Sequence, residues 1–197
     1  MSSLWQWSEL SQALSNTRVA GPAVQRVAFD SRQTVSGDLF FALAGDPGQR
    51  FNPGRRSQVD GHDYVLDAQA SGAVGAVVQR QLSNCDLPQI VVPDTYDALW
   101  QLGRTARKRL DGPVVAITGS SGKTTAKRFL AAALRAYAPP GSFNNHIGVP
   151  LSLANAAVDA PAWVFEIGTN HPGEIEPLTG LVRPHCSILL NVHNAHI

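Results

Sequence analysis

A glycine-rich loop between an apolar run and a helix-forming stretch constrains this chain more than any other feature. The sequence reads VVAIT at 114–118, GSSGKTT at 119–125 and AKRFLAAALRAY at 126–137. A β-branched run, a glycine loop and a helix, in this order, form the phosphate-binding unit of parallel α/β folds. The strict P-loop spacing would place a glycine at 117, where this chain has Ile117. The order of the elements, more than the loop alone, predicts nucleotide binding rather than a structural turn.

The residue types of this loop suit a nucleoside triphosphate. Its glycines let successive N–H groups turn toward one point, and a helix that begins near Lys123 adds its positive end. The ammonium group of Lys123 supplies a full charge for the terminal phosphates, and the hydroxyl of Thr124 can reach a bridging Mg²⁺. We therefore predict nucleotide and Mg²⁺ binding through Gly119, Ser120, Ser121, Gly122, Lys123, Thr124 and Thr125.

The overall charge points to a local site of this kind. The 197 residues include 16 Lys and Arg against 15 Asp and Glu, so no basic field exists to hold nucleic acid or an anionic membrane. Cys85 and Cys186 have the spacing of neither a zinc site nor a disulfide framework, which favours a reducing cytoplasm. No signal-peptide pattern and no apolar run of about 18 residues occurs. We expect a cytoplasmic monomer that neither binds nucleic acid nor enters the membrane.

Alternating strand and helix patterns predict an α/β fold with a parallel sheet. Before the loop we predict, in order, a helix at 4–15, two strands within 24–43, a helix at 63–71, strands at 73–78 and 89–94, and a helix at 95–110. After the loop we predict strands at 163–168 and 186–191. The DGP at 111–113 marks a boundary, so we expect domains at 1–110 and 111–197.

A basic cluster near the end of the helix at 95–110 favours a solvated helix face over a polyanion site. It consists of Arg104, Arg107, Lys108 and Arg109. Cations are favourable near the carboxyl end of a helix, because the helix dipole is negative there.

Polar residues near the ends of later strands are further candidates. Glu166 ends an apolar strand on the same rim of the sheet as the glycine loop, so it either binds Mg²⁺ or holds a water molecule, or it is an exposed strand-end glutamate. His193 and His196 follow the last strand and either bind metal or are solvated. Asn144 and Asn145 precede a tight apolar turn, where they either recognise a ligand or stabilise the turn.

Four motifs in order resemble the Mur ligases of peptidoglycan synthesis. They are DSRQTVSGDLFFALAG with DGHDYVLDAQASGAVGAVV, then TGSSGKTT, FNNHIGVPLSLA and EIGTNHPGEIEPLTGLVRPHCSILLNVHNAHI, and together they cover nearly the whole chain. The resemblance implies a small N-terminal domain that binds the UDP-muramoyl substrate, followed by part of a central ATP-binding domain. Within the family, the motifs are similar to the ligases that add D-alanyl-D-alanine.

The resemblance implies an ATP-dependent amide-bond ligase. The γ-phosphoryl group would pass to the carboxylate of a UDP-N-acetylmuramoyl tripeptide, and the amine of D-Ala-D-Ala would attack the acyl phosphate. Lys123 would act in catalysis with Glu166 and His196. Thr124 would bind one Mg²⁺, and Glu166 and His196 would bind a second. The matching substrate-binding residues are Asp30, Ser31 and Arg32 for the uridine diphosphate and Asn144 and Asn145 for the muramoyl group.

The chain departs from the family in three places. After the loop, the family usually has Thr or Val and then Lys-Glu, whereas this chain has Ala126-Lys127-Arg128. The segment 46–60 is longer than the usual connection, and no counterpart of a C-terminal domain is present. We therefore expect an incomplete portion of a ligase, inactive by itself. A stand-alone module that binds a UDP-sugar or nucleotide without turnover is the alternative, and the DSR and NNHIGVP motifs disfavour an ordinary P-loop kinase or ATPase.

Overall fold

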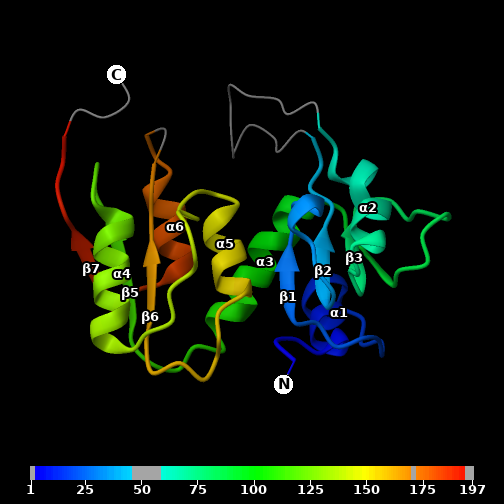
Figure 1. Ribbon diagram of the computed structural model, residues 1–197, viewed down its shortest axis with the longest axis horizontal. Helices are drawn as coiled ribbons and strands as arrows, with labels where there is room; N and C mark the ends of the chain where they lie inside the picture. The colour runs from blue at the N-terminus through cyan, green and yellow to red at the C-terminus, as the bar shows by residue number, and fades with distance from the viewer. Residues whose placement is uncertain (1–2, 46–58, 170–171, 194–197) are drawn as a thin grey trace. The chain divides into compact units, whose positions relative to one another are not determined.

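The computed structural model describes residues 3–45, 59–169 and 172–193, which belong to two compact units at 1–102 and 103–197 (Figure 1). Each unit is built on a parallel sheet, so the predicted α/β class is confirmed. The units divide within the helix α3 (Thr95–Arg107), whereas the boundary expected from the sequence follows that helix. Most of the loop at 46–60, singled out for its length, lies outside the described residues.

The first unit has four parallel strands in the order β1-β2-β3-β4. The strands are β1 (Arg26–Ala28), β2 (Asp38–Phe41), β3 (Gly75–Val78) and β4 (Gln89–Val91). The helices are α1 (Trp7–Ser15) and α2 (Val65–Ala70), with two 3-10 turns, η1 (Ser31–Gln33) and η2 (Gly61–Tyr64). The predicted strands and helices of this region are all present, with shorter bounds.

Both faces of this sheet are packed. On one face, Phe40 and Ala76 meet Val65 and Ala68 of α2 in a cluster of buried residues. On the other face, Trp7 of α1 lies directly over Gly75, where an added Cβ would stand 2.3 Å from the ring. A strand buried on both faces reads as a continuous apolar run, which explains why β2 and β3 were recognisable in the sequence.

The second unit has three parallel strands in the order β6-β5-β7. They are β5 (Val114–Thr118), β6 (Trp163–Glu166) and β7 (Cys186–Leu189), and the helices are α4 (Lys123–Leu134), α5 (Gly148–Ala154) and α6 (Ile175–Val182). Val115, Ile117 and Val164 face α4, because alternate residues of a strand share a face. Helices α5 and α6 lie on the other side of the sheet (Figure 1).

One member of the predicted solvated basic face is buried, and that part of the prediction is wrong. Arg107 is 7% exposed and donates hydrogen bonds to three carbonyl oxygens, those of Val182 (2.6 Å), Arg183 (2.8 Å) and Leu110 (3.2 Å). Its guanidinium therefore caps the carboxyl end of α6, where unpaired carbonyls and the helix dipole favour a cation. Arg104 and Lys108 are exposed, as expected.

Strand β7 is an edge strand with an open outer side. Its residues are mostly exposed, and Leu189 keeps 63% of its surface exposed. In the described ranges, no helix has the length and apolar character needed to cross a membrane.

Candidate nucleotide-binding site

The glycine loop connects β5 to α4 at the carboxyl edge of the second sheet. Gly119 has a φ of +144° and Gly122 a φ of +80°, a region that side chains with a Cβ rarely adopt. The ammonium of Lys123 lies over the loop and donates a 2.7 Å hydrogen bond to the carbonyl oxygen of Gly119. The first N–H groups of α4 have no acceptor within the helix, so they point outward beside this ammonium. The arrangement suits an anion.

Thr124 and Glu166 meet beside the loop. Ile117 of β5 pairs with Glu166 of β6, which places the carboxylate on the face of the sheet that α4 covers. The hydroxyl of Thr124 donates a 2.9 Å hydrogen bond to Oε2 of Glu166. Glu166 has no exposed surface, so it is not the exposed strand-end glutamate of the alternative reading.

The second carboxylate oxygen of Glu166 is a candidate ligand for the predicted magnesium site. Oε1 of Glu166 is buried, and the described residues offer it no hydrogen-bond partner. A buried acceptor without a partner is costly, and a hard cation with oxygen ligands would satisfy it, so Thr124 and Glu166 fit Mg²⁺. The described parts of the chain contain no cluster of three His, Cys, Asp or Glu side chains suited to a metal. His196, the third predicted ligand, lies outside the described residues.

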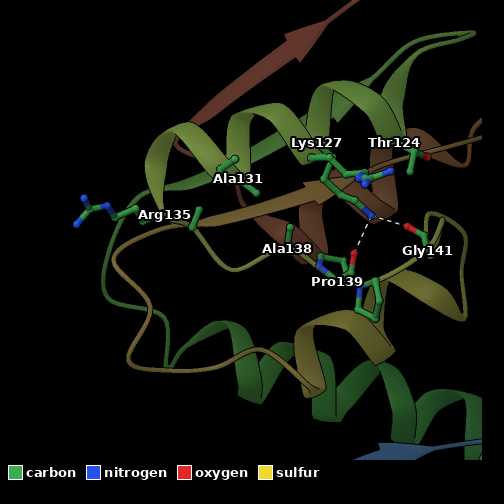
Figure 2. Close-up of a pocket in the computed structure, with 11 residues that line it drawn as sticks. Thr124, Lys127, Ala131, Arg135, Ala138, Pro139 and Gly141 are labelled. Atoms are coloured by element: carbon green, nitrogen blue, oxygen red, sulfur yellow. Dashed lines mark hydrogen bonds between the residues drawn. The ribbon is translucent and has the colours of Figure 1, made fainter.

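Lys127 is a charged residue in this site that sequence reasoning undervalued. It is 2% exposed, and its ammonium donates to the carbonyl oxygens of Pro139 (2.8 Å) and Gly141 (2.5 Å) (Figure 2). Burial lowers the pKa of Lys127, and the charge of Glu166 opposes that shift. A pocket of about 690 Å³ opens along this side of α4, from Thr124 to Arg135, whose side chain points away from Lys127 in Figure 2.

The chain after β7 runs along the glycine loop. Leu190 N–H donates to the carbonyl of Thr118 (3.0 Å), and Ser120 N–H donates to the carbonyl of Asn191 (3.2 Å). Oδ1 of Asn191 also accepts from the N–H of Ser121 at 3.0 Å. We did not single out Asn191 from the sequence, although a polar residue that follows a parallel strand next to a glycine loop lies on the ligand-binding rim.

The two asparagines of the NNHIGVP motif have local partners. Oδ1 of Asn145 accepts from the N–H groups of Ile147 (3.1 Å) and Gly148 (2.8 Å) and so caps the start of α5. The carbonyl of Asn144 accepts from the N–H of Gly168 at 2.8 Å, which places this residue just beyond β6. The turn-stabilising role therefore has direct support for Asn145, and recognition of a ligand stays a prediction.

In the first unit, the predicted uridine diphosphate residues follow β1. Both carboxylate oxygens of Asp30 accept from the guanidinium of Arg32, each at 2.8 Å. These hydrogen bonds hold the pKa of Asp30 below its usual value, against the opposing effect of burial. Arg32 is largely exposed and Ser31 is buried. The guanidinium of Arg32 therefore lies at the surface, near the carboxyl edge of this sheet.

A buried histidine, not predicted as a site residue, lies at the same edge. His62 is 3% exposed, with Nδ1 2.6 Å from Oδ1 of Asp60, and its Nε2 accepts the N–H of Gln79 at 2.8 Å. Because Nε2 is an acceptor, the ring proton lies on Nδ1 and faces the carboxylate. Burial raises the pKa of Asp60, but hydrogen bonds from His62 and Arg80 outweigh it, so this pKa lies below its ordinary value.

The parallel sheet, the glycine loop at the helix N-terminus and the buried carboxylate beside it define a parallel α/β protein with a loop of the phosphate-binding type. A family model described as the Mur ligase middle domain matches residues 117–197. The chain belongs to the Mur ligase family, and within it the similarity is to the MurF ligases.

Individual relatives agree with this assignment. The UDP-N-acetylmuramoyl-tripeptide–D-alanyl-D-alanine ligase of Haemophilus influenzae is 38% identical over 182 residues, which cover 88% of this chain and 37% of the relative. A crystal structure of MurF from Acinetobacter baumannii superposes with a TM-score of 0.79 at 34% identity, over 98% of this chain and 42% of that one. MurF from Thermotoga maritima in complex with ADP superposes with a TM-score of 0.66 at 34% identity, and the match covers 87% of this chain and 38% of that one. The chain thus spans about two fifths of the length of these relatives.

Proposed function

We propose that this chain supplies the nucleotide-binding and UDP-substrate-binding parts of a MurF-type ligase. The proposed reaction joins D-Ala-D-Ala to a UDP-N-acetylmuramoyl tripeptide at the expense of ATP. The observation that supports it best is the contact between Thr124 and Glu166, because it joins a hydroxyl after the P-loop lysine to a buried carboxylate with one unpaired oxygen. The similarity to MurF proteins, one of them in complex with ADP, supports the choice of ligand.

In this proposal, the residues around the glycine loop hold the phosphates of ATP. The ammonium of Lys123 and the N–H groups at the start of α4 bind the β- and γ-phosphates. Thr124, Glu166 and His196 would hold Mg²⁺, which would offset the repulsion between the phosphates and the approaching carboxylate. The γ-phosphoryl group then passes to the tripeptide carboxylate and ADP leaves. The amine of D-Ala-D-Ala attacks the acyl phosphate, forms the amide bond and releases phosphate.

The first unit would bind the UDP part of the substrate. Asp30, Ser31 and Arg32 stand at the carboxyl edge of its parallel sheet, the edge at which open α/β sheets bind ligands. Asp30 takes two of the N–H donors of the exposed Arg32 guanidinium, and the remaining N–H donors would bind the diphosphate. Asn144 and Asn145 would contact the muramoyl group.

Titration calorimetry with the 197-residue chain tests both binding functions. We expect binding of Mg·ATP and, separately, of the UDP-N-acetylmuramoyl tripeptide. Lys123→Ala should abolish the first and preserve the second, because Lys123 is expected to touch only the nucleotide. Arg32→Ala should weaken the second and preserve the first. An ATP affinity unchanged by Lys123→Ala would contradict the loop assignment, and no binding of the UDP substrate would contradict the MurF-type function.

A further inference from the structure

Asn191, in the segment that follows β7, forms hydrogen bonds with the glycine loop. Its backbone carbonyl accepts the N–H of Ser120 at 3.2 Å, and its side-chain Oδ1 accepts the N–H of Ser121 at 3.0 Å. Its Nδ2 donates back to the carbonyl oxygen and the hydroxyl of Ser121, both at 3.3 Å. The carboxamide therefore pairs with both the donor and the acceptor of one peptide segment, as a neighbouring strand would.

Further contacts join the segment after β7 to the glycine loop. The hydroxyl of Ser120 donates to the carbonyl of His193 at 3.1 Å and accepts the N–H of His193 at 2.9 Å. At Gly119 an added Cβ would lie 3.2 Å from the backbone of Asn191, so the two segments run in close contact. The pairing of β5 with β7 thus continues past the ends of both strands and into the loop.

These contacts divide the N–H groups of the loop into two sets. Those of Ser120 and Ser121 are already bonded to Asn191. Those of the first turn of α4, which begins at Lys123, have no acceptor within the helix. A phosphate at this loop would accept hydrogen bonds from the N–H groups at the start of α4. The N–H groups of Ser120 and Ser121, bonded to Asn191, would instead fix the conformation of the loop.

We propose that Asn191 is a positioning residue for nucleotide binding, which holds Ser120 and Ser121 so that Lys123 and the start of α4 face the phosphates of a nucleoside di- or triphosphate. This inference rests on the proposed function. A phosphate cradle gains affinity when its donors are held in place before the ligand arrives, because less conformational entropy is lost on binding. The side chain of a residue about 70 positions away in sequence supplies that order here.

Substitution of Asn191 separates this role from a role in folding. Asn191 is half-buried at the end of an exposed edge strand, so Asn191→Ala should leave the melting temperature within about 2 °C of the unaltered chain. We expect the dissociation constant for Mg·ADP to rise about 5- to 30-fold, as the loss of the three side-chain hydrogen bonds to Ser121 implies. Amide exchange at Ser121 should accelerate about tenfold or more in the absence of nucleotide. Val192→Ala, at a neighbouring position that is 78% exposed, is the matched control and should change neither quantity.

The conservative variant Asn191→Asp distinguishes order in the loop from charge. Its carboxylate keeps the acceptor for Ser121 N–H but loses the donor to the Ser121 carbonyl, so slow exchange at Ser121 should be partly restored. Its negative charge near the phosphates should still weaken binding of Mg·ADP, and that loss should shrink at high salt.

The two possible failures are distinguishable. If the unaltered chain does not bind Mg·ADP, the proposed function itself fails. If it binds and Asn191→Ala leaves both affinity and Ser121 exchange unchanged, only this inference is overturned. Equal losses of affinity in Asn191→Ala and Val192→Ala would also overturn it, because they would indicate a general disturbance of the segment after β7.

Discussion

The hydroxyl of Thr124 donates a 2.9 Å hydrogen bond to Oε2 of Glu166 and so joins the first turn of α4 to the end of β6. The two residues are far apart in sequence, and the pairing of β5 with β6 brings them together. One carboxylate oxygen is thereby satisfied, and the other stays buried without a partner among the described residues. In the proposed function, the two side chains would therefore also serve as oxygen ligands of Mg²⁺.

We predict that Thr124→Val and Glu166→Gln each weaken binding of Mg·ATP by about 10- to 100-fold, because each removes an oxygen ligand or its charge from the proposed Mg²⁺ site. Affinity for ATP measured in excess EDTA should change little. Thr124→Ser keeps the hydroxyl and is the control. Calorimetric titrations with and without Mg²⁺ make the comparison, and equal losses in both conditions would refute a role in metal binding.

Lys127→Met should destabilise the second unit by about 2 to 4 kcal/mol, because it leaves the carbonyl oxygen of the buried Pro139, and that of the more exposed Gly141, without this donor. Urea unfolding measures the loss. The exposed neighbour Arg128 offers the matched control, Arg128→Met, which should fall within about 0.5 kcal/mol of the unaltered chain. Similar stabilities for the two variants would contradict the role assigned to Lys127.

Arg107→Met should cost about 2 to 4 kcal/mol, since three carbonyls at the end of α6 and near the end of α3 lose their shared donor. Lys108→Met removes the same charge at an exposed position and should have little effect. Chemical denaturation followed by circular dichroism distinguishes the two. A solvated Arg107, as first expected from the sequence, would make both changes harmless.

Asp60→Asn should make the free energy of unfolding depend less steeply on pH in acid. Because the pKa of Asp60 is lower in the folded chain than in the unfolded one, its ionised form stabilises the fold above about pH 4, the unfolded value, and that contribution disappears as the pH falls through the folded pKa. The variant should be less stable at neutral pH and should approach the unaltered chain near pH 2.

Unfolding free energies measured from pH 7 to pH 2 check this expectation for Asp60. Asp63→Asn makes the same change in net charge at an exposed position and serves as its control. Parallel pH profiles for Asp60→Asn and the unaltered chain would be inconsistent with a stabilising role of the Asp60 carboxylate.

Gly75→Ala should destabilise the first unit by about 2 to 3 kcal/mol, because the added Cβ would stand 2.3 Å from the ring of Trp7 and force α1 away from the sheet. Gly180→Ala, in α6, meets no atom within 4 Å and should be neutral or stabilising. Thermal melts of both variants, with tryptophan fluorescence as the probe, test the prediction. A melting temperature unchanged by Gly75→Ala would show that Trp7 does not rest on this strand.

Much of the fold was predictable because its signals are local. The apolar runs of β2, β3 and β5 reflect burial on both faces of a sheet, and the glycine loop predicted a nucleotide site from seven consecutive residues. The place of Glu166 on the rim of the sheet followed from its position at the end of an apolar strand. Its complete burial did not, because that depends on α4 covering the same face.

The sequence by itself determined the α/β class, the order of the strands along the chain and the position of the phosphate loop, since each depends on residue types within a short window. Only the tertiary structure decided the partners of the long polar side chains. Arg107 caps α6, Lys127 holds the carbonyls of Pro139 and Gly141, and Asn191 holds the loop at Ser121. Each partner lies in a distant segment that the packing of the sheet brings within hydrogen-bond reach, and no local pattern encodes that proximity.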